Sequence, residues 1–309
     1  MKVVVIGAGG FVGRQVAEIL GQRPGIDRLL LVDRVAPKRR GPGIEALQGD
    51  ISDPAIRARI CEGADAVICL AAILGGAAEA DYALARRVNL DATLDLAEAL
   101  RDANPATRFV FASTIAAYGK PMPDPVTDAT PLAPSMVYGA QKVMMEVALS
   151  NFAARGWLDA LSLRPSGVMA RDGADAALRT AFLSRLFWCI RRGEDITLPV
   201  PETGRTWLTS VRNVAQNFVH GALLPDPGPV RAFTLPALSL TFAELVEALQ
   251  RRFPDSRARV RFAPDPELTA LFASYPRLVT ETADRLGFAR DADADALVRD
   301  AMIEEEEIA

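Results

Sequence analysis

A tyrosine and a lysine stand four residues apart in this chain, at Tyr138 and Lys142, within a helical pattern over residues 137–154. Residues with this spacing lie on the same face of an α-helix. An ammonium group beside a phenol stabilises the phenolate, which lowers the pKa of tyrosine from its ordinary value of about 10. The spacing therefore predicts a tyrosine general base. The alternative is an exposed pair that meets by chance.

Two hydroxyl residues, Ser113 and Thr114, come directly after an apolar run over residues 108–112 that is typical of a buried strand. Ligands of parallel α/β sheets bind beyond the carboxyl ends of the strands. We therefore expect the hydroxyl of Thr114, or that of Ser113, to hold the reacting oxygen of a substrate.

The first apolar run of the chain ends in glycines with the spacing G-x-x-G-x-x-G, at Gly7, Gly10 and Gly13, with Phe11 and Val12 in the same turn. Glycine lets the backbone approach a pyrophosphate closely, and the N-terminus of the following helix directs unpaired N–H groups at the anion. The cluster favours a dinucleotide site over a structural turn.

An acidic residue, Asp33, ends the second apolar run, at the distance where a carboxylate accepts hydrogen bonds from the adenosine ribose. A carboxylate at this position repels a 2′-phosphate, which favours NAD over NADP. The nearby Arg34, Lys38, Arg39 and Arg40 could offset one negative charge, so NADP is the alternative cofactor.

Short apolar runs alternate with amphipathic helical patterns over residues 1–165. The strands are expected at 2–6, 28–32, 66–70, 108–112 and 161–163, and the helices at 14–20, 55–61, 83–101 and 137–154. This alternation predicts an α/β fold with a doubly wound parallel sheet.

Residues 166–309 have shorter elements and proline-rich joints, which predicts a smaller α/β lobe over the carboxyl edge of the sheet. This lobe is expected to bind substrate, while residues around 211–235 return to the sheet. The capping-box sequence from Thr241 to Glu244 predicts the start of a helix.

Together these motifs resemble the extended short-chain dehydrogenase/reductase superfamily over essentially the whole chain. Further matches are Gly49–Ile51, Leu70–Ala72, Asn89, Tyr118–Gly119 and Arg164–Pro165. The resemblance implies a Rossmann-type fold, with Thr114 as the catalytic hydroxyl and Ser113 as the alternative. It also implies that the remaining matched residues form a nicotinamide-dinucleotide site. Asp50 and Ile51 would lie at the adenine, and Leu70, Ala71 and Ala72 along the pyrophosphate and ribose. Asn89 would belong to the same site, with Pro165, Tyr138 and Lys142 at the nicotinamide end.

The resemblance extends to a branch of this superfamily that oxidises the C2 hydroxyl of small, D-erythronate-like sugar acids with NAD. Members that act on nucleotide sugars carry an acidic pair where this chain has Arg212 and Asn213. A guanidinium suits a carboxylate better than a neutral sugar ring. We therefore expect Arg212, with Arg205 and Ser210, to bind the substrate. Salt bridges are the alternative for both arginines, and a nucleotide-sugar epimerase or dehydratase is the alternative function.

The composition of the chain argues against several other classes of protein. The net charge of −4 argues against a nucleic-acid ligand. Three scattered cysteines and one histidine fit neither a disulfide framework nor a metal site, so we expect a cytoplasmic protein without a metal. No apolar run is long enough to span a membrane. The resemblance implies a homodimer. A cofactor-binding regulator without catalysis is disfavoured by the joint presence of Thr114, Tyr138 and Lys142.

Overall fold

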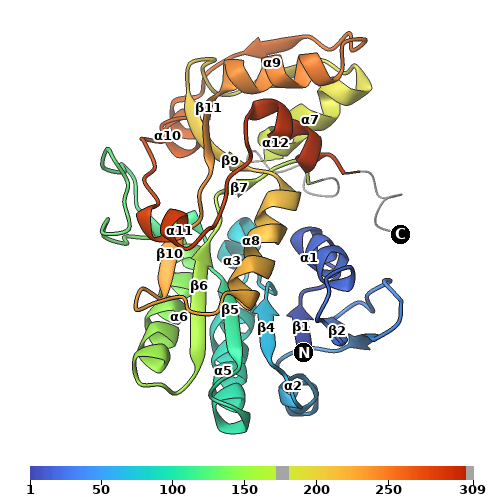
Figure 1. Ribbon diagram of the computed structural model, residues 1–309. Coiled ribbons are helices and arrows are strands. Elements are labelled where there is room, and N and C mark those ends of the chain that lie inside the picture. The colour runs from blue at the N-terminus through green and yellow to red at the C-terminus, as the bar shows by residue number, and fades with distance from the viewer. Residues whose placement is uncertain (172–180, 304–309) are drawn as a thin grey trace.

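The computed structural model describes residues 1–171 and 181–303. Within these ranges, seven parallel strands form one sheet in the order β10-β6-β5-β4-β1-β2-β3 (Figure 1). From β1 inside the sheet, β2 and β3 extend to one edge. The strands that follow in the chain, β4, β5, β6 and β10, extend from β1 to the opposite edge. This doubly wound order confirms the predicted fold class. The strands are β1 (Lys2–Ile6), β2 (Arg28–Asp33), β3 (Ile44–Gln48), β4 (Ala66–Cys69), β5 (Arg108–Ala112), β6 (Asp159–Arg164) and β10 (Ala232–Thr234).

Helices cover both faces of the sheet (Figure 1). Val3 and Val5 of β1 pack with α1 and α8, whereas Val4 packs with α2, α5 and α6. Successive residues of one strand enter different cores because their side chains point to opposite faces of the sheet. The helices of these layers are α1 (Phe11–Gly21), α2 (Pro54–Cys61), α3 (Gly75–Ala80), α4 (Tyr82–Arg86), α5 (Ala92–Ala103), α6 (Val137–Ala154) and α8 (Val211–Leu223).

A smaller lobe lies beyond one end of the sheet, where Figure 1 shows α7, α9 and α12 grouped together. It has its own core, which includes Phe187, Leu208 and Phe242. The capping box predicted at Thr241 is present at the start of α9. The elements are β7 (Gly167–Val168), α7 (Phe182–Arg192), β8 (Ile196–Leu198), β9 (Arg205–Thr209), β11 (Leu238–Thr241), α9 (Phe242–Arg252), β12 (Val260–Phe262), α10 (Pro266–Phe272), α11 (Glu281–Arg285) and α12 (Ala294–Ala301).

The structure differs from the sequence-based expectations at an edge strand and in one helix. The edge strand β3 was not predicted, because its residues are mixed in polarity and none of them is fully buried. The helix expected over 83–101 is interrupted by a π-helical turn at Arg87–Asp91. No helix of the described ranges is long and apolar enough to cross a membrane.

Candidate active site

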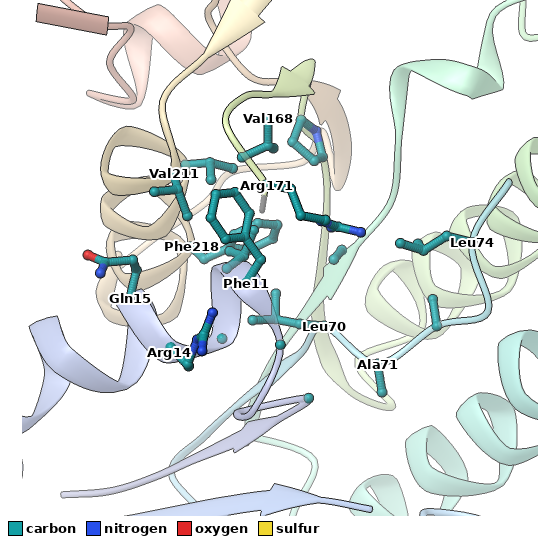
Figure 2. Close-up of a pocket in the computed structure, with 18 of the residues that line it drawn as sticks. Phe11, Arg14, Gln15, Leu70, Ala71, Leu74, Val168, Arg171, Val211 and Phe218 are labelled. Carbon is teal, nitrogen blue, oxygen red and sulfur yellow. The ribbon is translucent and has the colours of Figure 1, made fainter. Parts of the chain in front are cut away.

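A cavity of about 930 Å³ lies between the carboxyl ends of the parallel strands and the smaller lobe. This volume is near the upper end of the range for ligand-binding cavities, roughly 300–1,000 Å³. Figure 2 shows Phe11 and Arg14 of α1 on one side of it, facing Val211 and Phe218 of α8, with Leu70 and Ala71 below. The cavity is therefore positioned where ligands bind in doubly wound sheets.

The glycine turn between β1 and α1 forms the floor of the cavity through Gly7, Gly10 and Gly13. Gly7 has a φ of +83°, and a Cβ there would lie 2.9 Å from the backbone nitrogen of Ala71. A Cβ at Gly13 would collide with the carbonyl oxygen of Gly7. The N-cap residue of α1, Gly10, brings no side-chain acceptor for the N–H groups of the first turn. This cradle fits the pyrophosphate of a dinucleotide.

Two carboxylates mark one end of the cavity, at Asp33 and Asp50. Asp33 accepts a hydrogen bond from the backbone nitrogen of Gly9 at 2.9 Å. Asp50 accepts one from the nitrogen of Ser52 at 2.9 Å, and this bond holds the pKa of Asp50 below its ordinary value. Both side chains are thus fixed by backbone groups, as residues that meet a ribose or an adenine must be.

The other residues that the sequence predicted at the cofactor divide into those that line the cavity and one that is buried behind it. Phe11, Val12, Ile51, Leu70, Ala71, Ala72 and Pro165 all line the cavity. Asn89 does not: it is fully buried in the π-helical turn, where its carboxamide bonds the backbone nitrogen and oxygen of Ile73 at 2.8 and 2.9 Å. These bonds fix the loop after β4, and the cofactor contact expected of Asn89 stays a prediction.

Tyr138 and Thr114 both line the cavity wall, and the Thr114 hydroxyl lies close enough to the phenol to lower its pKa. Lys142 Nζ lies 5.7 Å from the centre of the Tyr138 ring and 4.3 Å from that of Phe111. Lys142 is 1% exposed and is not among the residues that line the cavity. Burial raises the pKa of Tyr138 to about 12. Loss of solvation outweighs the two effects that lower the pKa of Tyr138, the charge of Arg171 and the Thr114 hydroxyl. The lowering of this pKa that is expected from Lys142 stays a prediction.

Ser113 differs from Thr114 in the partner of its hydroxyl. The Ser113 hydroxyl donates a short hydrogen bond to Glu146 Oε1, and Glu146 in turn binds Arg164 through two bonds of 2.8 and 2.6 Å. Ser113, Glu146 and Arg164 are all buried. The geometry therefore favours Thr114 over Ser113 as the hydroxyl that meets a substrate.

Lys142 gives a stability prediction whose sign depends on pH. Burial lowers the pKa of Lys142 from 10.5 to about 8, so below pH 8 the fold carries a poorly solvated charge. Lys142→Met is expected to raise the free energy of unfolding at pH 7 by about 2 kcal/mol. Between the folded pKa of about 8 and the ordinary value of 10.5, folding of the wild type releases a proton from Lys142. The free energy of unfolding of the wild type therefore rises with pH in this range, and the difference in stability between the wild type and Lys142→Met becomes smaller.

Urea denaturation of wild type and Lys142→Met at pH 7 and pH 10 measures this effect. The measurement at pH 10 is the internal control, because the difference in free energy of unfolding between Lys142→Met and the wild type must be smaller there. A variant less stable than the wild type at pH 7 would contradict the prediction.

The three substrate residues expected from the sequence lie away from the cavity. Arg205 bonds the carbonyl of Ser239 at 3.3 Å and pairs with Glu244. Arg212 pairs with Asp300, 3.9 Å away. Ser210 is fully buried at the N-cap of α8, where its hydroxyl donates to Asp291 at 2.6 Å. None of the three is among the described cavity residues. The structure thus agrees with the salt-bridge alternative for both arginines, and substrate binding by them stays a prediction.

Other cationic and aromatic side chains line the cavity, among them Arg171, Trp188 and Arg191 of the smaller lobe. Trp188 Nε1 donates to the carbonyl of Ala170 at 3.1 Å, and the Arg191 guanidinium lies 5.5 Å from the centre of the Trp188 ring. Sequence analysis missed these residues because no spacing motif connects them to the sheet. Glu146 had a detectable signal, since it continues the four-residue spacing of Tyr138 and Lys142.

Comparisons with known proteins show the family to which the chain belongs. The model of the NAD dependent epimerase/dehydratase family matches residues 3–229. The chain is 35% identical to D-erythronate dehydrogenase of Cupriavidus necator, covering 98% of both chains, and 32% identical to that of Haemophilus influenzae, covering 94% of this chain and 96% of the relative. A crystal structure described as the nucleoside-diphosphate-sugar epimerase from Agrobacterium tumefaciens superposes with a TM-score of 0.89 at 30% identity, over 100% of this chain and 95% of that one. The chain therefore belongs to the NAD dependent epimerase/dehydratase family and is a nicotinamide-dependent oxidoreductase of the extended short-chain dehydrogenase/reductase type.

Proposed function

We propose that this protein is an NAD-dependent dehydrogenase that oxidises the C2 hydroxyl of a small sugar acid, D-erythronate or a close analogue, to the 2-keto acid. The observation that carries the proposal is that Tyr138 and Thr114 line the same cavity as the glycine turn. Full-length similarity to two D-erythronate dehydrogenases supports the choice of substrate. In this proposal residues 1–165, with 211–235, bind the dinucleotide, and the rest of 166–309 mainly binds the substrate.

The proposed chemistry assigns each side chain a separate task. Bound NAD would accept the hydride that leaves C2. In its phenolate form, which requires positive charge from Lys142 and Arg171 to offset the effect of burial on its pKa, Tyr138 takes the proton of the C2 hydroxyl on its own oxygen. Thr114 holds the oxygen that becomes the carbonyl. Lys142 supplies positive charge on the same face of α6 as Tyr138. Orientation of the substrate provides much of the rate gain.

A substrate panel tests this function. Purified protein is incubated with NAD and D-erythronate, D-threonate, L-threonine, UDP-glucose or UDP-galactose, and both reduced cofactor and sugar products are measured. We expect reduction of NAD with the four-carbon sugar acids. Interconversion of the UDP-sugars, without reduction of NAD by any acid, would instead establish the epimerase alternative.

Asp33 should decide which cofactor is used. We expect the wild type to have a kcat/KM at least about tenfold higher with NAD than with NADP, because the Asp33 carboxylate repels a 2′-phosphate. Asp33→Asn should raise kcat/KM for NADP by about tenfold, which corresponds to roughly 1.4 kcal/mol of transition-state stabilisation. An unchanged melting temperature is the control for folding. A wild-type preference for NADP would contradict the role of Asp33.

We also propose that the protein forms a homodimer through α6. Met144 and Val147, one turn apart on this helix, are 57% and 66% exposed. Exposed apolar side chains grouped on one helix face are typical of an interface. Val147→Glu should convert the dimer to a monomer in analytical ultracentrifugation while preserving the circular dichroism spectrum. A wild type that sediments as a monomer would refute the proposal.

A further inference from the structure

The backbone is strained just before Arg171. Among the described non-glycine residues, Ala170 has a positive φ, +63°. For a residue with a Cβ, this left-handed conformation costs about 1–2 kcal/mol. Such strain persists only where the surrounding structure enforces it, and it is common at functional sites. Here Ala170 is 1% exposed and its carbonyl accepts the 3.1 Å hydrogen bond from Trp188. The conformation is thus fixed by packing and by one aromatic side chain.

The consequence of this conformation is the direction of Arg171. Arg171 lines the cavity, and Figure 2 shows its side chain extending across it towards Leu74. Its guanidinium carbon lies 5.8 Å from the centre of the Phe11 ring. The positive charge of Arg171 also lowers the pKa of Tyr138, against the larger opposite effect of burial. The guanidinium and the phenol thus share one cavity.

Other arginines are less suited to meet a substrate at Tyr138. Arg14 lies on α1, at the glycine turn, and Arg34 follows Asp33, at the opposite end of the cavity from Tyr138 in the proposed binding mode. Arg191 lies beside the Trp188 ring. Arg205 and Arg212 pair with acidic residues outside the cavity. Of all these, Arg171 is the one whose charge acts on Tyr138.

We propose that Arg171 is the anion site of the cavity and binds the carboxylate of the 2-hydroxy acid whose C2 hydroxyl meets Tyr138. The inference rests on the proposed function and names the residue that would select an acid over a neutral polyol. In a 2-hydroxy acid, the carboxylate carbon is bonded directly to C2. A cation close to the phenol can therefore bind the carboxylate while the hydroxyl lies at the base. A guanidinium can do so through two parallel hydrogen bonds.

Arg171→Gln tests the assignment, with Arg171→Lys as the conservative variant and Arg212→Gln as the matched control. We expect Arg171→Gln to raise KM for D-erythronate about 100-fold, Arg171→Lys to raise it about tenfold, and Arg212→Gln to leave it unchanged. The preference for D-erythronate over erythritol, which has a neutral CH2OH in place of the carboxylate, should fall by the same factor in Arg171→Gln.

A binding measurement without turnover separates this effect from catalysis. Calorimetric titration of D-erythronate into the enzyme–NADH complex should show about 100-fold weaker binding to Arg171→Gln, while the affinity for NADH stays within about twofold. If Arg171→Gln binds D-erythronate as tightly as the wild type, the assignment of Arg171 is wrong although the proposed function stands. A wild type that oxidises no sugar acid removes the proposed function itself.

Discussion

Replacement of Tyr138 by phenylalanine is expected to lower kcat by at least about a thousandfold, the usual contribution of a positioned general base being roughly 10²–10⁴. The change removes one oxygen atom and keeps the ring that packs in the wall of the cavity. No other side chain of the proposed site can take a proton from the C2 hydroxyl at the position of the phenol.

The measurement is the initial rate of NAD reduction with D-erythronate. Quenching of protein fluorescence by NADH serves as the control, since cofactor affinity should not change when only the phenol oxygen is lost. Thr114→Val is the matched variant of the other hydroxyl in the cavity wall. It should lower kcat less than Tyr138→Phe does, because it leaves the base in place. Turnover of Tyr138→Phe within tenfold of the wild type would exclude Tyr138 as the base.

Local spacing was sufficient to predict the parts of the site that belong to one turn or one helix. The glycines at Gly7, Gly10 and Gly13 line the cavity as expected, because their function depends on backbone geometry within seven residues. Tyr138 and Lys142 lie on one helix, whose bounds were also predicted. The same local reasoning could not give the pKa of Tyr138, which depends on burial by residues distant in sequence.

The long-range partners of Arg205 and Arg212 could not be predicted from the sequence. Both arginines were assigned to a substrate because a guanidinium suits a carboxylate, whereas their partners in the fold, Glu244 and Asp300, cannot be identified from sequence spacing. Arg171 was not predicted as a site residue for a different reason. Its direction depends on the left-handed backbone at Ala170, and an alanine gives no sequence signal for a positive φ.

Beneath the site lies a buried ion pair that joins three of its elements. Glu146 of α6 binds Arg164, the last residue of β6, and accepts the hydrogen bond of Ser113, which follows β5. Arg164 directly precedes Pro165, and Ser113 directly precedes Thr114. The carboxylate thus holds the strand ends that carry the wall of the cavity and the hydroxyl beside Tyr138. Its loss should affect both stability and geometry.

Glu146→Leu is expected to lower the free energy of unfolding by about 3–5 kcal/mol, because it leaves the Arg164 guanidinium buried without a counter-charge. Glu146→Gln keeps the size of the side chain and one acceptor oxygen, so it should cost less. Urea denaturation of the three proteins gives the values. The double variant Glu146→Leu/Arg164→Leu should recover part of the loss, since it removes both charges and not only one. If Glu146→Leu unfolds at the wild-type urea midpoint, the pair does not hold the strand ends, and the position of Thr114 must depend on the packing of β5 alone.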